Sequence, residues 1–197
     1  MHVMRLLAIL FAFLLGSLPF AVWLGRLAGI DPRTVGDGNP GATNAWKAGG
    51  WRLGVLVLAL DVAKAWLPVW LARTYGGWGG LSLVAIALAP TLGHAFSPFL
   101  RGRGGKGLAS TFGVWAGLTP YALGALALGM GVTIALLGWR LRDGWAVQMG
   151  LLTLAAFGLW QQWETPLWVL LGIHAAWLAW MYRHDMRAGL RKEPRHA

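Results

Sequence analysis

The chain has 197 residues, of which 57% are hydrophobic and only 12% are charged, and its mean hydropathy is +0.55. A water-soluble domain of this size could not bury so much apolar surface, so the composition excludes an ordinary soluble protein and predicts a membrane protein with several spans. The formal net charge is +10, but the cations cluster between apolar runs, which membrane topology explains better than nucleic-acid binding. The sequence has no cysteine, which excludes disulfides and thiol chemistry.

The first apolar run, Val3–Gly25, is predicted to be a transmembrane helix. It lacks the clean small-x-small cleavage site of a signal peptide, and the later spans need an entry helix. Pro19 lies inside this run, and we expect it to kink the helix or to mark a re-entrant turn.

The longest polar stretch follows at Arg26–Gly50 and is rich in glycine, proline and asparagine. Such a segment cannot be a lipid-facing helix. In a protein otherwise built of helices, it is predicted to be an ordered, functional loop. A plain hydrophilic connector is the alternative.

The second span is predicted at Trp51–Leu71 and carries two charges, Asp61 and Lys64. Their i, i+3 spacing places them on one helix face, where they can form an ion pair. Charges at this depth face a bundle interior or a polar cavity. The sequence leaves open whether this pair only fixes helix packing or also meets a substrate.

The third span, Leu81–Leu100, has His94 near its end and leads into Gly104-Gly105-Lys106-Gly107. Glycine backbones can bring N–H groups close to a phosphate, lysine adds a positive charge, and the next helix presents its positive N-terminus. We therefore predict a phosphate cradle at the membrane surface. It is not a Walker A loop, because GxxxxGK[ST] is absent. A basic loop that only follows membrane topology is the alternative.

The remaining spans complete an all-α protein with about seven transmembrane helices. A tight hairpin is expected at Thr119-Pro120, and Gly113 and Gly117 form a GxxxG pattern that favours close helix packing. These spans are predicted at Gly107–Leu118, Tyr121–Trp139, Val147–Trp160 and Pro166–Tyr182.

The distribution of cations predicts the orientation. Of the 17 Lys and Arg residues, Arg5 and Arg73 lie on one side of the predicted spans, Lys64 is intramembrane, and all the others lie on the opposite side. The positive-inside rule then places the N-terminus outside and the C-terminus in the cytoplasm. We expect one membrane domain, 1–197, whose cytoplasmic segments are about 26–50, 101–106, 140–146 and the tail 183–197.

Two glycine-rich basic loops are thus expected on the same face. Hydrogen-bonding side chains and the charges of Lys47 and Lys106 could hold an anionic head group there while an acyl chain stays in the bilayer. The HxxxxD arrangement of other acyltransferases is absent, since Phe99 follows His94 and Ala179 follows His174 at that spacing. GxSxG and metal-ligand spacings are absent as well.

Several ordered motifs resemble the bacterial acyl-phosphate:glycerol-3-phosphate acyltransferase (PlsY) family. They are Gly16–Phe20, Gly38-Asn39-Pro40-Gly41-Ala42-Thr43-Asn44, Leu60-Asp61-Val62-x-Lys64, Gly93-His94-x-Phe96, and Pro98-Phe99-Leu100 running into Gly104–Gly107. The resemblance implies a seven-helix enzyme of the bacterial inner membrane. It would move an acyl group from acyl phosphate to the 1-hydroxyl of glycerol 3-phosphate, giving lysophosphatidate and phosphate in the first step of phospholipid synthesis. It implies no acyl-CoA, no direct use of acyl carrier protein, no metal and no cofactor. We expect a monomer.

The chain departs from the family pattern at four places. Asp37 stands where the family usually has serine, and Lys47 where it usually has arginine. The third loop, Arg142–Ala146, lacks the family's serine, and the tail has Arg183-His184-Asp185-Met186 in place of His-Arg-Glu-Asn. Lys47 keeps its charge but loses the bidentate fork of arginine.

The resemblance and the residues together give a site hypothesis. Lys106 and loop N–H groups would stabilise the developing phosphate charge, with Asp37, His184 or a substrate phosphate accepting the proton. The candidate catalytic residues are Lys106, Asp37 and His184. The candidate substrate-binding residues are Gly38, Asn39, Gly41, Thr43, Asn44, Lys47, His94, Gly104, Gly105, Gly107 and Arg183.

The sequence leaves two other functions open. The chain could be a catalytically altered paralogue that binds phosphorylated lipid precursors. It could also be a small membrane transporter with Asp61 and Lys64 along its path, although the absence of a clear internal repeat argues against this.

Overall fold

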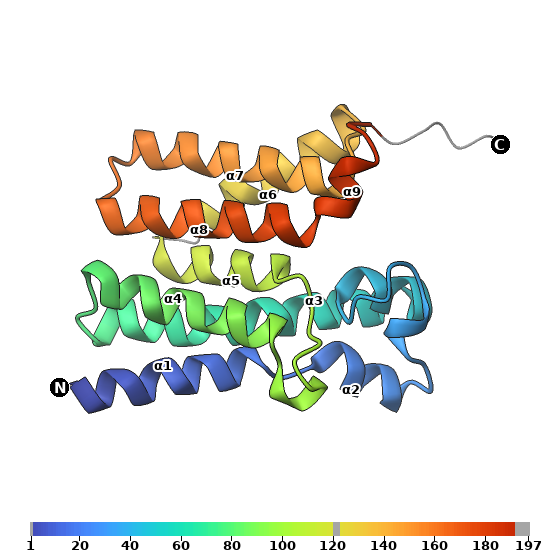
Figure 1. The fold of residues 1–197 in the computed structure, drawn as a ribbon, viewed down its shortest axis with the longest axis horizontal. Coiled ribbons are helices and arrows are strands. Elements are labelled where there is room, and N and C mark those ends of the chain that lie inside the picture. Colours follow the sequence, from blue (N-terminus) through green and yellow to red (C-terminus); the bar gives the residue numbers. More distant parts are fainter. Residues whose placement is uncertain (1, 120–122, 192–197) are drawn as a thin grey trace. The chain divides into compact units, whose positions relative to one another are not determined.

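The computed structural model describes residues 2–119 and 123–191, and within these ranges the chain is helical and has no β-strand (Figure 1). The chain divides into two compact units, Met1–Leu118 and Thr119–Ala197. The all-helical prediction is confirmed for the described residues.

The first unit contains the two predicted glycine-rich loops. Its helices are α1 (His2–Gly16), α2 (Phe20–Leu27), α3 (Ala42–Tyr75), α4 (Gly80–Ala95) and α5 (Leu108–Leu118), with 3-10 turns at Pro32–Thr34 and Pro98–Leu100. The predicted interruption near Pro19 is confirmed, because α1 ends at Gly16 and α2 begins after Pro19.

The predicted loop Arg26–Gly50 is shorter than expected, since α3 already begins at Ala42. Gly41 has an extended backbone and precedes a run that forms the first turns of the helix. Gly50 alone departs from helical geometry, with φ at 83°, a left-handed conformation that glycine adopts without strain. The glycines at the end of the predicted loop thus kink a helix instead of ending a loop.

Small residues allow the helices of this unit to pack closely. Figure 1 shows α4 (green) beside α1 (blue), and a Cβ on Gly93 would overlap the carbonyl of Phe13. Gly113 and Gly117 of α5 face the α3 backbone at Val62 and Trp66 in the same way. The predicted role of the GxxxG pattern in helix packing is therefore confirmed.

Three helical segments are long and apolar enough to cross a membrane: His2–Leu27, Ala42–Tyr75 and Gly80–Leu100. Shorter apolar helices occupy Leu108–Leu118, Leu123–Leu137 and Thr165–Met181. These lengths and compositions support a helical membrane protein, while the count of seven spans stays a prediction.

The second unit contains α6 (Leu123–Thr133), a π-helical turn at Ile134–Gly138, α7 (Asp143–Trp160), α8 (Thr165–Met181) and the short α9 (Arg183–Arg187). The helix predicted at Val147 begins earlier, at Asp143, and the predicted tail begins as α9. The hairpin predicted at Thr119-Pro120 and the helix start predicted at Tyr121 fall on residues 120–122, outside the described residues.

Candidate active site

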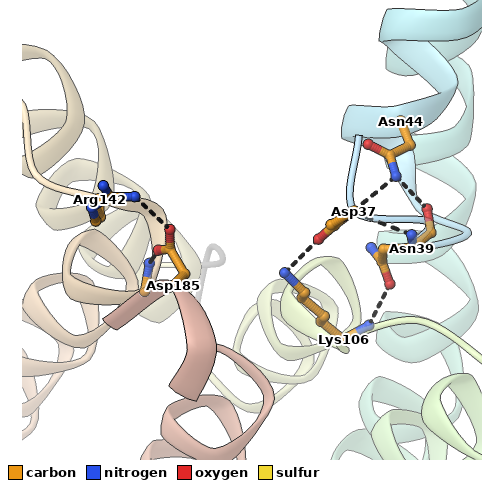
Figure 2. A network of polar contacts seen from close by, with 7 residues as sticks. Asp37, Asn39, Asn44, Lys106, Arg142 and Asp185 are labelled. Carbon is orange, nitrogen blue, oxygen red and sulfur yellow. Dashed lines mark hydrogen bonds and ion pairs between the residues drawn. The ribbon is translucent and has the colours of Figure 1, made fainter. Parts of the chain in front are cut away.

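The first glycine-rich loop and the loop before α5 meet at one ion pair. Lys106 Nζ lies 2.6 Å from Asp37 Oδ2 (Figure 2). The Asp37 side chain is half exposed and that of Lys106 is 23% exposed, so solvent reaches the pair. Two residues from distant parts of the sequence thus form one polar centre.

Two asparagines hold this centre together. The Asn44 side chain donates to Asp37 Oδ1 at 2.9 Å and to the Asn39 backbone carbonyl at 3.0 Å. The Asn39 backbone N–H donates to Asp37 Oδ1 at 3.2 Å (Figure 2). The Asn39 side chain in turn accepts from the backbone N–H of Lys106 at 3.1 Å. The predicted residues Asp37, Asn39, Asn44 and Lys106 are therefore brought together in one network.

The surroundings of Asp37 favour its charged form. Partial burial opposes ionisation, but the hydrogen bond and charge of Lys106, together with the Asn39 amide and the Asn44 side chain, outweigh it and hold the pKa of Asp37 below its ordinary value of 3.8. Asp37 is therefore a carboxylate at neutral pH and adds a negative charge to this site.

The glycines before Lys106 pack directly on the end of α4. Gly104 N–H donates to the Ala95 carbonyl at 2.9 Å, and Gly105 N–H donates to the His94 carbonyl at 3.1 Å. A Cβ on Gly104 would overlap the His94 carbonyl, and one on Gly105 would overlap the His94 imidazole. Only glycine fits at these two positions, and this packing fixes the backbone from which Lys106 projects.

Two helix N-termini flank the network. The α3 helix begins at Ala42 directly after the Asn39 loop, and no side chain caps it in the described structure. The α5 helix begins at Leu108 after Gly107, whose φ of +91° turns the chain into the helix. Both N-termini present free N–H groups and the positive end of the helix dipole, which favour an anionic ligand.

A buried polar layer lies next to the glycine loop, in contact through His94. Lys64 Nζ lies 2.7 Å from Asp61 Oδ1, with both side chains 2% exposed, which confirms the predicted ion pair. His94 Nδ1 is 3.8 Å from the same carboxylate oxygen. Lys64 also donates to the Leu18 carbonyl at 2.7 Å, so the pair holds the break between α1 and α2.

Sequence reasoning missed two serines of this layer. Ser97 donates its hydroxyl to the Ser17 carbonyl at 2.6 Å, and Ser17 donates to the Phe13 carbonyl at 2.7 Å. Both line a small pocket with Pro40, Asp61, Lys64, His94 and Gly105. Ser17 belongs to the Gly16–Phe20 motif, but no local pattern indicated the contact between the two serines, because it joins residues 80 positions apart.

Other predicted substrate-binding residues lie around the network. Thr43 and Lys47 are exposed on the first turns of α3. A Cβ on Gly36 would lie 3.2 Å from Lys47 Nζ, so this cation is beside the loop. Gly38 has a left-handed backbone with a φ of +72°, and Gly41 packs on the side-chain amide of Asn39.

The tail residues Arg183 and His184 lie on α9, in the second unit. Arg183 donates to the Trp180 carbonyl at 2.8 Å and stacks over the Trp180 ring. In the same unit, Asp185 accepts from Gly144 N–H at 2.7 Å and lies 3.8 Å from Arg142 (Figure 2). The grouping of Arg183 and His184 with Lys106 stays a prediction.

Among residues 2–119 and 123–191, no group of three or more His, Asp or Glu side chains is placed to hold a metal ion. The polar centre instead combines amide, ammonium and helix N-terminal donors, which suit an anion.

The fold and site together define a helical membrane protein with a polar centre of ammonium, amide and carboxylate groups beside two helix N-termini. The family model for glycerol-3-phosphate acyltransferase matches residues 6–192, so the chain belongs to this family. The glycerol-3-phosphate acyltransferase of Albidiferax ferrireducens is 38% identical over 190 residues, which cover 91% of this chain and 82% of that protein. The one from Laribacter hongkongensis is 45% identical over 134 residues, 66% of each chain.

Solved structures agree with the sequence comparisons. The crystal structure of PlsY (YgiH), an integral membrane glycerol 3-phosphate acyltransferase, in its glycerol 3-phosphate form matches with a TM-score of 0.85 and 30% identity. The match covers 93% of this chain and 90% of that one. The lysophosphatidic acid form matches with a TM-score of 0.84 and 29% identity.

Proposed function

We propose that this protein transfers a fatty acyl group from acyl phosphate to the 1-hydroxyl of glycerol 3-phosphate, producing lysophosphatidate and phosphate. The observation that carries the proposal is the position of Lys106, which follows two close-packed glycines and meets an anionic oxygen beside two helix N-termini. Family membership supplies the substrates, and this centre supplies the place where their phosphates would bind.

The reaction needs stabilisation of charge more than a protein nucleophile. The hydroxyl oxygen attacks the acyl carbon, a new C–O bond forms, and the bond from carbon to the phosphate oxygen breaks. Phosphate leaves with the electron pair, and Lys106 with nearby N–H groups stabilises that charge. Holding the hydroxyl against the acyl carbon supplies much of the rate.

Asp37 already forms an ion pair with Lys106, the residue that would bind the substrate phosphate. Its carboxylate oxygen lies where a phosphate oxygen would pair with Lys106, so a bound substrate has to displace it or share the cation. The lowered pKa of Asp37 also makes it a weak base. This favours a substrate phosphate as the proton acceptor and gives Asp37 the role of a competing anion.

The proposal includes a multi-pass protein of the bacterial inner membrane, with seven spans, one membrane domain, an outside N-terminus and both glycine-rich loops in the cytoplasm. The distribution of Lys and Arg supports this orientation. Because the chain has no native cysteine, single cysteines at Arg101 and Tyr75 can be labelled without a background. A membrane-impermeant thiol reagent applied to intact cells should label Tyr75→Cys and spare Arg101→Cys.

The activity is tested by phosphate release from palmitoyl phosphate, with and without glycerol 3-phosphate, using purified protein shown to be folded. Release that requires glycerol 3-phosphate is the expected result. Binding of glycerol 3-phosphate without release would identify a catalytically altered paralogue. Flux of glycerol 3-phosphate into liposomes that is independent of acyl phosphate would identify a transporter.

A further inference from the structure

An apolar groove lies in the first unit, at the other end of the helices from Lys106. Its volume is about 270 Å³, and its lining comes from the middle of α1, the last turns of α3, the turn that follows α3 and the first half of α4. The lining residues are Ala8, Phe11, Pro68, Leu71, Ala72, Tyr75, Gly76, Trp78 and Ile86. The Lys106 loop instead packs on His94, at the far end of α4, so the groove and the active site are separate.

The cation Arg5 lies beside an aromatic residue of this groove. The Arg5 guanidinium carbon lies 5.5 Å from the centre of the Trp78 ring, and Trp78 lines the groove. Arg5 precedes Ala8 by three residues, so both project from the same face of α1. Among the described residues, no carboxylate forms an ion pair with Arg5.

The placement of Arg5 is unusual for its side of the protein. Only Arg5 and Arg73 lie on the side of the predicted spans opposite to the other loop cations, and Arg73 follows Ala72 of the groove. Tryptophan and tyrosine at this level are typical of the boundary between head groups and acyl chains. The apolar groove suits an acyl chain, and the unneutralised cation and aromatic rings at its mouth suit an anionic head group. A lipid carries both groups in one molecule.

We propose that this groove binds an anionic phospholipid of the surrounding bilayer, with an acyl chain along the groove and the phosphate at Arg5. Burial of methylene groups against Ala8, Ala72 and Ile86 would contribute the apolar part of the affinity. The Arg5 guanidinium would select anionic over zwitterionic head groups. The inference does not depend on the proposed acyl transfer, because none of these residues belongs to the Lys106 centre.

The test measures retained lipid by native mass spectrometry of the full chain, titrated with phosphatidylglycerol or phosphatidylcholine in detergent. The wild type should retain phosphatidylglycerol preferentially, and Arg5→Gln should weaken its apparent affinity by about fivefold, as expected for one interfacial cation. Ala72→Phe, which fills the groove, should reduce binding of both lipids.

Arg52→Gln is the matched control. Arg52 lies 5.6 Å from the Trp51 ring, a contact of the same kind that is not part of the groove, so its loss should leave lipid binding unchanged. Equal effects of Arg5→Gln and Arg52→Gln, or equal retention of the two lipids by the wild type, would overturn the proposal. A lipid-free dimer would do so as well, because it would identify a second copy of the chain as the occupant.

Discussion

The ammonium group of Lys106 lies 2.6 Å from a carboxylate oxygen of Asp37, so an acid of the chain itself neutralises the cation that we propose binds the substrate phosphate. The same carboxylate also accepts hydrogen bonds from Asn39 and Asn44. Asp37 therefore holds the loop in place through these contacts, and under the proposed function it would also compete with the substrate phosphate for Lys106.

Asp37→Ser should lower the KM for the phosphorylated substrates. Removing a like charge from a partly exposed site is worth about 1 kcal/mol, or about fivefold in KM, with kcat changed less. Steady-state phosphate release measures both constants. Asp31→Ser is the matched control, since Asp31 forms a similar pair with Arg33 in the same loop and should leave KM unchanged. A large fall in kcat of Asp37→Ser would instead identify Asp37 as a general base.

The competition from Asp37 should not vary between pH 5.5 and 8.5. The pKa of Asp37 is lowered in the folded protein, so the ion pair persists above the ordinary carboxyl range and is lost only as the pH falls below it. The ratio of KM values for wild type and Asp37→Ser cancels the titration of the substrate phosphates, and we expect it to stay constant. A ratio that approaches one at pH 5.5 would show that Asp37 titrates near neutrality.

Lys106→Ala should reduce kcat by at least about a hundredfold, the usual effect of losing one donor to a developing anion. The variant should stay folded, because Lys106 is partly exposed and its backbone N–H still donates to Asn39. Arg103→Ala, an exposed cation in the same loop, is the control and should retain most activity. Full turnover by a folded Lys106→Ala protein would end the assignment of this lysine.

Loss of either partner of the buried Asp61–Lys64 ion pair should lower the stability of the protein strongly. Replacing either residue alone leaves one charge unpaired in a site where both side chains are 2% exposed, which typically destabilises a protein by about 3–5 kcal/mol. Thermal unfolding in detergent should show a lower Tm for Lys64→Met and for Asp61→Leu. The double variant should recover a large part of the loss; a double-variant loss equal to the sum of the two single losses would show that the pair is not coupled.

The sequence predicted those features that depend on local spacing. Asp61 and Lys64 share a helix face because three residues span nearly one turn, and Gly113 and Gly117 do so for the same reason. Turn-forming residues also marked the break at Pro19. The early start of α3 was not predicted, because the glycines near Gly50 suggested a loop, whereas a single left-handed residue only kinks the helix.

The contacts of the active site could not be predicted from spacing, because they join distant segments. The Asn39 side chain meets the Lys106 backbone across 67 positions, and this depends on how α3, α4 and α5 pack. The glycine-rich loop indicated Lys106 as a site residue and the resemblance to a known family drew in Asp37, but neither indicated their ion pair. In the same way, nothing in the order of residues indicated that Gly105 would lie against the His94 ring.

That contact gives the last prediction. Gly105→Ala adds a Cβ that would overlap the His94 imidazole, so either the ring or the Lys106 loop has to move. Movement of the loop would displace Lys106, and a displacement of about 1 Å can cost about a hundredfold in rate, whereas movement of the ring would disturb the buried approach of His94 to Asp61. Activity and Tm should therefore fall together. Gly172→Ala is the matched control, since its Cβ would enter open space on α8 and should leave Tm unchanged or slightly higher. Combining Gly105→Ala with His94→Ala removes the overlap and should restore Tm; a Tm that stays low in the double variant would locate the damage elsewhere.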